Sequence, residues 1–128
     1  MIVVDTSALM AVIFNEPDRD RFMQAILGAR RACMSAGSVV EAAAVYASAF
    51  QDGDPARVAE DLSRLRIEVE PMTADQAWIA ASARFTYGKG RNGLNIGDCF
   101  AYALATSLKA PLLFKGNDFA LTDIEAAA

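Results

Sequence analysis

Short apolar runs alternate with helical patterns along this chain. The run at residues 2–4 is β-branched, uncharged and without alternation, which is typical of a strand buried on both faces. Residues 67–72 alternate between apolar and polar, as a half-buried strand does. Two further short strands are predicted at 32–35 and 111–114. The helical spacing between them predicts helices at 7–14, 17–27, 38–50, 55–66, 74–85 and 96–110.

Strands that alternate with helices predict an α/β fold with a central parallel sheet covered on both faces. The 128 residues contain no repeat, linker or low-complexity segment, so we expect a single domain over 1–128. In such folds ligands bind beyond the carboxyl ends of the strands. Polar residues that directly follow strands are therefore the first candidates for a functional site.

Composition excludes several kinds of site. The chain has no histidine, which excludes Ser-His-Asp and Cys-His nucleophilic sites and zinc sites with histidine ligands. Cys33 and Cys99 lie far apart without a CxxC motif, so we expect free thiols in the core. The sequence shows no basic start of a signal peptide and no apolar run of about 18 residues. We therefore expect a cytoplasmic protein that does not enter the membrane.

The charge is unevenly distributed. Sixteen acidic residues outnumber twelve basic ones, giving a net charge of −4, which by itself argues against a nucleic-acid-binding protein. No acidic residue occurs between Asp75 and Asp98, however, whereas Arg84, Lys89 and Arg91 lie in that segment. A locally basic strip is therefore predicted on an acidic protein.

Four carboxylates stand in unusual places. Asp5 ends the first predicted strand, Asp118 follows the last, and Asp98 lies in the first turn of a helix that is apolar almost all round. Glu41 is surrounded by alanine and valine, and no Lys or Arg between residues 33 and 54 offers it a helical ion-pair partner. All four would lie at the same edge of the sheet.

Each carboxylate also has an ordinary explanation. Asp5 can cap the next helix, and Asp118 can stabilise a turn. Asp98 forms a plausible capping box with Asn95, and Glu41 can project from the helix edge into water. Together, however, clustered carboxylates repel one another, and a divalent cation with oxygen ligands, such as Mg²⁺, relieves that repulsion. The cluster predicts metal-dependent phosphoryl transfer through an activated water.

Four segments resemble those of a known family. They read MIVVDTSAL from residue 1, SAGSVVEAA from 35, GLNIGDCFAYALA from 93 and PLLFKGNDFALTDI from 111. Across essentially its whole length the chain resembles PIN-domain ribonucleases, and within them the VapC-type toxins of toxin–antitoxin pairs. The resemblance implies a three-layer α/β/α fold and an endoribonuclease that depends on Mg²⁺, with Mn²⁺ as a substitute. It further implies a homodimer silenced by a cognate antitoxin that binds near the active site.

The resemblance also assigns roles to the acidic residues. Asp5 and Asp98 match the core metal ligands, and Glu41 matches an acid that helps to hold the metal or a second ion. For the fourth acid we expect Asp118, with Asn117 as the alternative. The metal-held site would hydrolyse an RNA phosphodiester.

Further residues near these acids are candidates for supporting roles. The hydroxyls of Thr6 and Ser7 can bond the first carboxylate, bind phosphate or cap the helix, and Asp123 is a weaker site candidate. Four basic residues are candidates for holding the RNA backbone, although a solvated surface explains each of them equally well: Arg84, Lys89, Arg91 and Lys115. The alanine-rich segment 38–65 offers apolar surface for an antitoxin, although ordinary core packing explains it equally well.

Two other protein classes share parts of this pattern. Haloacid-dehalogenase-type phosphatases place an Asp after the first strand but need a second acid two residues later, where this chain has Ser7. Phosphorelay receiver domains have a lysine after the last strand, which Lys115 imitates. They also need paired acids after the first strand and a phosphoacceptor Asp after a middle strand, and the sequence offers neither. Both classes remain alternatives here.

Overall fold

The computed structural model describes residues 1–51, 53–90 and 93–128. Within them four strands form one parallel sheet in the order β3-β2-β1-β4. The strands are β1 (Ile2–Val4), β2 (Ala32–Ser35), β3 (Ile67–Glu70) and β4 (Leu112–Leu113). The helices are α1 (Thr6–Ile13), α2 (Arg19–Gly28), α3 (Ala36–Ala49), α4 (Pro55–Arg64), α5 (Ala74–Tyr87) and α6 (Ile96–Leu108). The predicted alternation of strands and helices is therefore correct.

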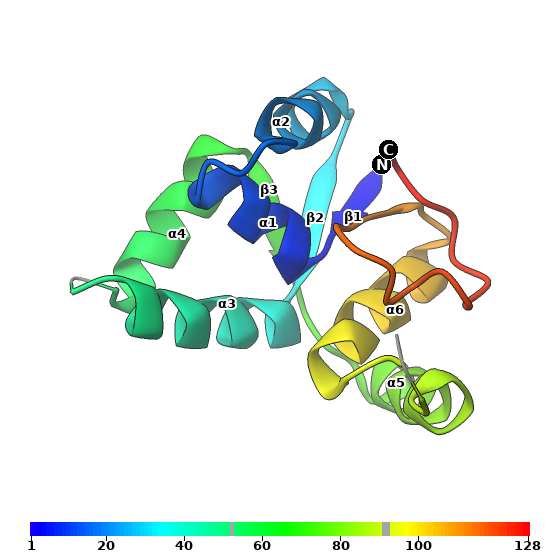
Figure 1. Cartoon of the computed structure of the whole chain (residues 1–128). Coiled ribbons are helices and arrows are strands. Elements are labelled where there is room, and N and C mark those ends of the chain that lie inside the picture. Colours follow the sequence, from blue (N-terminus) through cyan, green and yellow to red (C-terminus); the bar gives the residue numbers. More distant parts are fainter. Residues whose placement is uncertain (52, 91–92) are drawn as a thin grey trace.

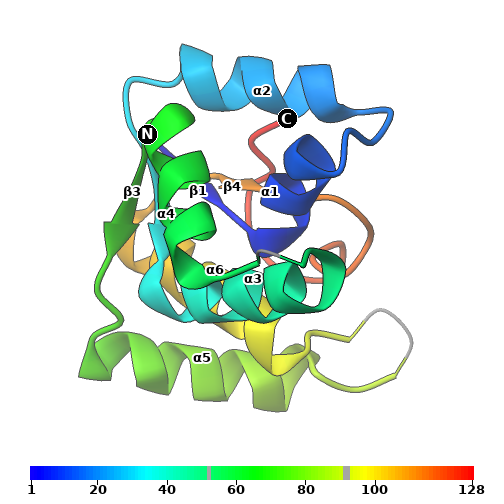
Figure 2. The same cartoon turned by 90° about the vertical axis from the view of Figure 1, so that its left-hand side faces the viewer.

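The two faces of β1 look into separate cores. Val4 packs in a core with residues of α1, α2, α3 and α4, whereas Val3 packs in a second core with residues of α5 and α6. Both valines are fully buried, as a strand covered on both faces requires. Figure 1 shows α1 to α4 on one side of the sheet and α5 and α6 on the other. Figure 2 views the molecule from the side of α1 to α4, with α2 at the top, α5 at the bottom and α6 behind α3. The predicted three-layer α/β/α arrangement is confirmed.

Strand β1 lies in the middle of the sheet and sets its register. Val3 stands opposite Cys33 of β2 and opposite Leu112 of β4, and both pairings are parallel. The N–H of Asp5 still donates to the carbonyl of Leu113 at 2.9 Å. The first residue after β1 is thus fixed to its neighbour strand, at the edge where all four strands end.

The ends of several elements differ from the prediction. Helix α1 starts at Thr6, one residue earlier than predicted, and of the three candidate caps Asp5, Thr6 and Ser7 it is Asp5 whose side chain accepts from the N–H of Ser7. Helix α2 begins at Arg19, two residues later than Pro17 suggested. The last strand keeps only two of its four predicted residues. Thr73 caps α5, and the predicted cap Asn95 of α6 is confirmed.

The C-terminal segment covers the outer edge of β4. The N–H of Leu112 donates to the carbonyl of Glu125 at 2.8 Å, and the N–H of Ala127 donates to that of Leu112 at 2.9 Å. This pairing protects the backbone of an edge strand that would otherwise be free to pair with another chain. Both cysteines are buried free thiols, as predicted. No helix in the described part of the chain is long and apolar enough to cross a membrane.

Candidate active site

Asp5 is a buried carboxylate that ends the central strand. Its residue is 3% exposed, and its Oδ2 accepts hydrogen bonds from the Ser7 hydroxyl at 2.5 Å and the Ser7 N–H at 3.0 Å. Its other oxygen, Oδ1, is buried and has no hydrogen-bond partner. Burial and, to a smaller extent, the charge of Glu41 raise the pKa of Asp5 to about 6, against the lowering effect of the Ser7 hydrogen bonds. Helix capping alone does not explain this carboxylate, since capping uses only one of its oxygens.

Asp98 reaches the same edge from the first turn of α6. Its N–H donates to Oδ1 of Asn95 at 2.8 Å, and its Oδ2 accepts from the Asn95 N–H at 3.0 Å, which completes the predicted capping box. Burial raises the pKa of Asp98 to about 7 despite that hydrogen bond. The charges of Asp5, Asp118 and Glu41 contribute to this increase. The four predicted acids therefore act on one another electrostatically, with Asp98 at their centre.

Glu41 lies against the start of α6 instead of projecting freely into water. It is half-buried on α3, and its carboxylate packs on Gly97, the residue before Asp98. A Cβ at position 97 would overlap both Oε1 and Oε2 of Glu41. The absence of a side chain at Gly97 therefore makes room for the Glu41 carboxylate beside Asp98.

The loop after β4 brings the fourth acid toward the others. Asp118 is half-buried, and its charge acts on Asp98. Asn117 is exposed, and its backbone carbonyl accepts from the N–H of Ala120 at 3.0 Å. Asn117 is neutral, whereas the charge of Asp118 contributes to the raised pKa of Asp98. This favours Asp118 of the two alternatives.

These carboxylates suit a hard divalent cation. Their oxygens are the ligands that Mg²⁺ prefers, and Oδ1 of Asp5 is buried without a partner. A nearby cation would also stabilise the charged forms of Asp5 and Asp98, which burial and mutual repulsion disfavour. Among the described residues, no three Asp, Glu or Cys side chains are arranged to hold an ion by themselves. The fit is thus to an ion held by one or two carboxylates, with water and phosphate as its other ligands.

The predicted supporting residues separate into two groups. The Ser7 hydroxyl bonds Asp5, and that of Thr6 donates to the carbonyl of Ser38 at 3.3 Å, tying α1 to α3. Asp123 accepts from the hydroxyl of Tyr102 at 2.6 Å and is exposed. Ser7 therefore touches a site carboxylate, whereas Thr6 and Asp123 hold the surrounding structure together.

The four basic candidates differ in how free their charges are. Arg84 is exposed and donates to the carbonyl of Gly88 at 2.8 Å, and Lys89 is exposed beside the ring of Phe85. Arg91 lies outside the described residues. Lys115 does not fit the prediction of a phosphate-binding base, because its ammonium is already paired with Glu16 at 2.8 Å and Asp18 at 3.1 Å.

Sequence reasoning missed several residues that shape this edge. Gly97 gives no signal except its place before Asp98, and Ser38 places a buried hydroxyl there without a hydrogen-bond partner. Glu16 and Asp18 flank Pro17 between α1 and α2, where two acids suggest only a solvated loop. Their contact with Lys115 joins segments about 100 residues apart, which no local pattern can indicate.

Comparison with known proteins identifies the family. A family model described as the PIN domain matches residues 2–125. Ribonuclease VapC30 of Mycobacterium tuberculosis is 45% identical over 131 aligned residues, covering 99% of this chain and 98% of the relative. The chain belongs to the VapC ribonucleases of the PIN-domain family. The predicted resemblance and the predicted type of function, a ribonuclease toxin of a toxin–antitoxin pair, are confirmed.

Solved structures agree on the PIN-domain fold. The crystal structure of Mycobacterium tuberculosis VapC20, described as a sarcin–ricin-loop-cleaving toxin, matches with a TM-score of 0.75 at 18% identity, covering 97% of this chain and 96% of the other. A toxin–antitoxin complex from Klebsiella pneumoniae matches with a TM-score of 0.72 at 19% identity, covering 96% and 93%. With the PIN-domain family established, the receiver and phosphatase alternatives lose their support.

The raised pKa values make a prediction about stability without metal. An acid whose pKa is raised from 3.8 to about 7 binds its proton more tightly folded than unfolded. The free energy of unfolding therefore falls as the pH rises from about 4 to about 7, and levels off above that range. Asp98→Asn removes this contribution and keeps an oxygen for the Asn95 N–H. With a chelator present at pH 8, we expect the variant to be more stable than the wild type by a few kcal/mol, since one pKa unit is worth about 1.4 kcal/mol.

Urea unfolding between pH 4.5 and 8 measures this difference. Asp75→Asn is the matched control, because Asp75 is an exposed acid in the first turn of α5. A wild-type curve that rises over this range relative to Asp98→Asn would contradict the prediction.

Proposed function

We propose that this chain is a metal-dependent endoribonuclease whose reaction centre is the set of four carboxylates Asp5, Glu41, Asp98 and Asp118. The observation that carries the proposal is the buried Oδ1 of Asp5, which has no partner and lies next to a second carboxylate of raised pKa. Such an arrangement is unfavourable unless a cation compensates it. Membership of the VapC ribonucleases supports RNA as the substrate.

The carboxylates have different roles in this proposal. Asp5 and Asp98 hold Mg²⁺, or Mn²⁺ in its place, while Glu41 and Asp118 complete the negative field around it. A divalent cation, when bound, supplies Lewis acidity and lowers the pKa of a water molecule. Glu41, which packs against Gly97, and Asp118 would be the carboxylates available to accept a proton at this end of the sheet. Since the chain has no histidine, the carboxylates at this edge are the natural proton acceptors in this proposal.

The RNA backbone needs positive charge outside the acidic centre. Arg84, Lys89 and Arg91 are our candidates, because they form the acid-free segment between Asp75 and Asp98. Lys115 is not among them, since its charge is compensated by Glu16 and Asp18. The relative VapC20 is described as cleaving the sarcin–ricin loop. We propose that the substrate is a single-stranded RNA or an RNA loop, and that the protein acts on it in the cytoplasm.

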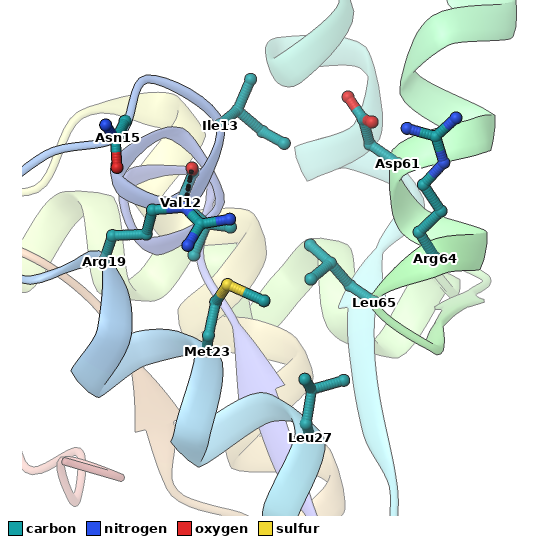
Figure 3. Close-up of a pocket in the computed structure, with 9 residues that line it drawn as sticks. All are labelled: Val12, Ile13, Asn15, Arg19, Met23, Leu27, Asp61, Arg64 and Leu65. Atoms are coloured by element: carbon teal, nitrogen blue, oxygen red, sulfur yellow. Dashed lines mark hydrogen bonds between the residues drawn. The ribbon is translucent and has the colours of Figure 1, made fainter.

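A groove between α1, α2 and α4 suits the antitoxin. It encloses about 560 Å³ and contains none of the four carboxylates. Figure 3 shows apolar side chains of Ile13, Met23, Leu27 and Leu65 facing it, with charged groups beside them. An amphipathic segment fits such a surface. The structural neighbour solved as a toxin–antitoxin complex supports an antitoxin partner. Of the alanine-rich segment 38–65, only α4 and the adjacent Leu65 contribute to the groove.

A second apolar surface supports a homodimer. Phe85 of α5 and Ile96 at the start of α6 are 78% and 66% exposed, and a hollow of about 230 Å³ lies between α5 and α6. Of these two residues, Ile96 lines the hollow and Phe85 does not. Large exposed apolar side chains are typical of association surfaces. Because Ile96 is two residues from Asp98, such a dimer would place the reaction centre next to the partner subunit.

Cleavage of a mixed RNA pool tests the function. We expect cleavage with Mg²⁺ or Mn²⁺ and none with a chelator. Asp98→Asn should slow cleavage at least about 100-fold, because several kcal/mol of transition-state stabilisation depend on the cation. Asp75→Asn, prepared in the same way, should cleave like the wild type. Equal cleavage by Asp98→Asn would show that the activity comes from another site or from a contaminant.

Gly97→Ala tests the place of Glu41. The new Cβ overlaps the carboxylate of Glu41, which is the mobile end of a side chain, so the carboxylate should move while the fold persists. We expect Gly97→Ala to reduce metal-activated cleavage as much as Glu41→Ala does. The double variant should lose nothing more, because both changes remove the same group. Gly28→Ala is the control, since a Cβ there meets no atom within 4 Å. Additive losses in the double variant would contradict this geometry.

Sedimentation measurements test the dimer. Phe85→Asp places a charge on the proposed association surface and should convert a dimer into a monomer. Leu121→Asp changes another exposed apolar residue, 75% exposed, which lies in the loop after β4 and not on α5 or at the start of α6. We expect it to leave the dimer intact. A wild-type chain that stays monomeric at micromolar concentration would contradict the proposal.

A further inference from the structure

Lys115 joins the segment after β4 to the segment between α1 and α2. Its Nζ lies 2.8 Å from Oε1 of Glu16 and 3.1 Å from Oδ1 of Asp18, so one ammonium bridges two carboxylates. The hydrogen bonds to Glu16 and Asp18 raise the pKa of Lys115, which keeps the cation charged. All three side chains are partly exposed, and ion pairs of this kind contribute little to stability. Any larger role of these ion pairs must come from the groups that they hold in place.

The backbone of Lys115 is connected directly to the first site carboxylate. Its N–H donates to Oγ of Ser7 at 3.0 Å, and the same hydroxyl donates to Oδ2 of Asp5 at 2.5 Å. The hydroxyl proton of Ser7 is therefore directed at Asp5, because the Ser7 oxygen is already accepting from Lys115. Oδ2 of Asp5 is held by this chain of bonds, and Oδ1 is left free.

The anchor stands at the point where the chain leaves the sheet. Lys115 follows the last strand by two residues, and Gly116 comes next with a φ of 98°, a conformation that favours glycine. The loop beyond it carries Asp118. Gly116 allows the chain many backbone conformations. The anchored side chain of Lys115 therefore determines where its own N–H meets Ser7 and in which direction the loop leaves the sheet.

We propose that Lys115, anchored by Glu16 and Asp18, is a positioning residue that orients Asp5 for cation binding through the Ser7 hydroxyl. This inference rests on the proposed function, since it assumes that Asp5 is a ligand. It replaces the sequence-based expectation that Lys115 contacts RNA. Partners that orient a metal ligand typically change metal affinity or activity by about 10-fold to 100-fold when they are removed.

Direct binding of Mn²⁺ to the purified full chain without RNA tests this role. Free Mn²⁺ is measured by electron paramagnetic resonance during a titration. Lys115→Met removes a positive charge near an anionic site, so electrostatics alone would tighten Mn²⁺ binding. Positioning requires the opposite sign, and we expect binding at least about 10-fold weaker. Lys115→Arg keeps the bridge and should bind Mn²⁺ within about twofold of the wild type.

Three further variants separate positioning from other roles. Glu16→Gln combined with Asp18→Asn releases Lys115 without removing it and should weaken Mn²⁺ binding as Lys115→Met does. Ser7→Ala should weaken it too, and adding Lys115→Met to Ser7→Ala should cost little more. Arg31→Met is the matched control for stability. Arg31 also bridges two acids, Glu68 and Glu70, but it lies before β2, at the opposite edge of the sheet.

The outcomes separate this inference from the proposed function. Weaker Mn²⁺ binding in Lys115→Met, with Arg31→Met unchanged and both melting temperatures similar, supports the positioning role. Unchanged or tighter Mn²⁺ binding in Lys115→Met overturns it, while metal-dependent cleavage by the wild type would still uphold the proposed function. A wild-type chain that neither binds Mn²⁺ nor cleaves RNA with metal overturns both.

Discussion

The desolvation of Asp5 is the constraint on which the rest of the site depends. A carboxylate at the end of a strand buried on both faces loses most of its hydration, and one of its oxygens finds no partner. The second acid, Asp98, is raised in pKa by its own burial and by the charges of the other three. This unfavourable arrangement lies at one edge of the sheet. A divalent cation there would attract all of the carboxylates and so offset the repulsion between them.

Each carboxylate of the site is held in place by a different structural feature. The parallel register places Asp5 beside the end of β4, and the capping box of α6 fixes Asp98 in that helix's first turn. Gly97 makes room for Glu41 across the contact between α3 and α6. The ion cluster of Lys115, Glu16 and Asp18 fixes the start of the loop that carries Asp118. Site geometry and fold are therefore specified by many of the same contacts.

The sequence was sufficient to predict which carboxylates lie at one edge of the sheet, but not the contacts between them. Asp5 and Asp98 were predictable because a charge interrupts a local apolar pattern in each case, and strand order brings such positions to one edge. Asp5, Thr6 and Ser7 were all candidates for the cap of α1, since each can accept from a backbone N–H of the first turn. The packing of Glu41 on Gly97 and the pairing of Lys115 with Glu16 depend on tertiary contacts between distant segments, which periodicity and composition do not encode. Lys115 was consequently predicted to be a free base.

Locating a bound cation tests the central claim most directly. Crystals of the full chain grown with Mn²⁺ would show the ion in an anomalous difference map. We expect a peak within bonding distance of Oδ1 of Asp5 and of the Asp98 carboxylate, with water as further ligands. A peak only at other acids, such as Glu16 and Asp18, or no peak at all at millimolar Mn²⁺, would contradict the claim that these carboxylates form the metal site.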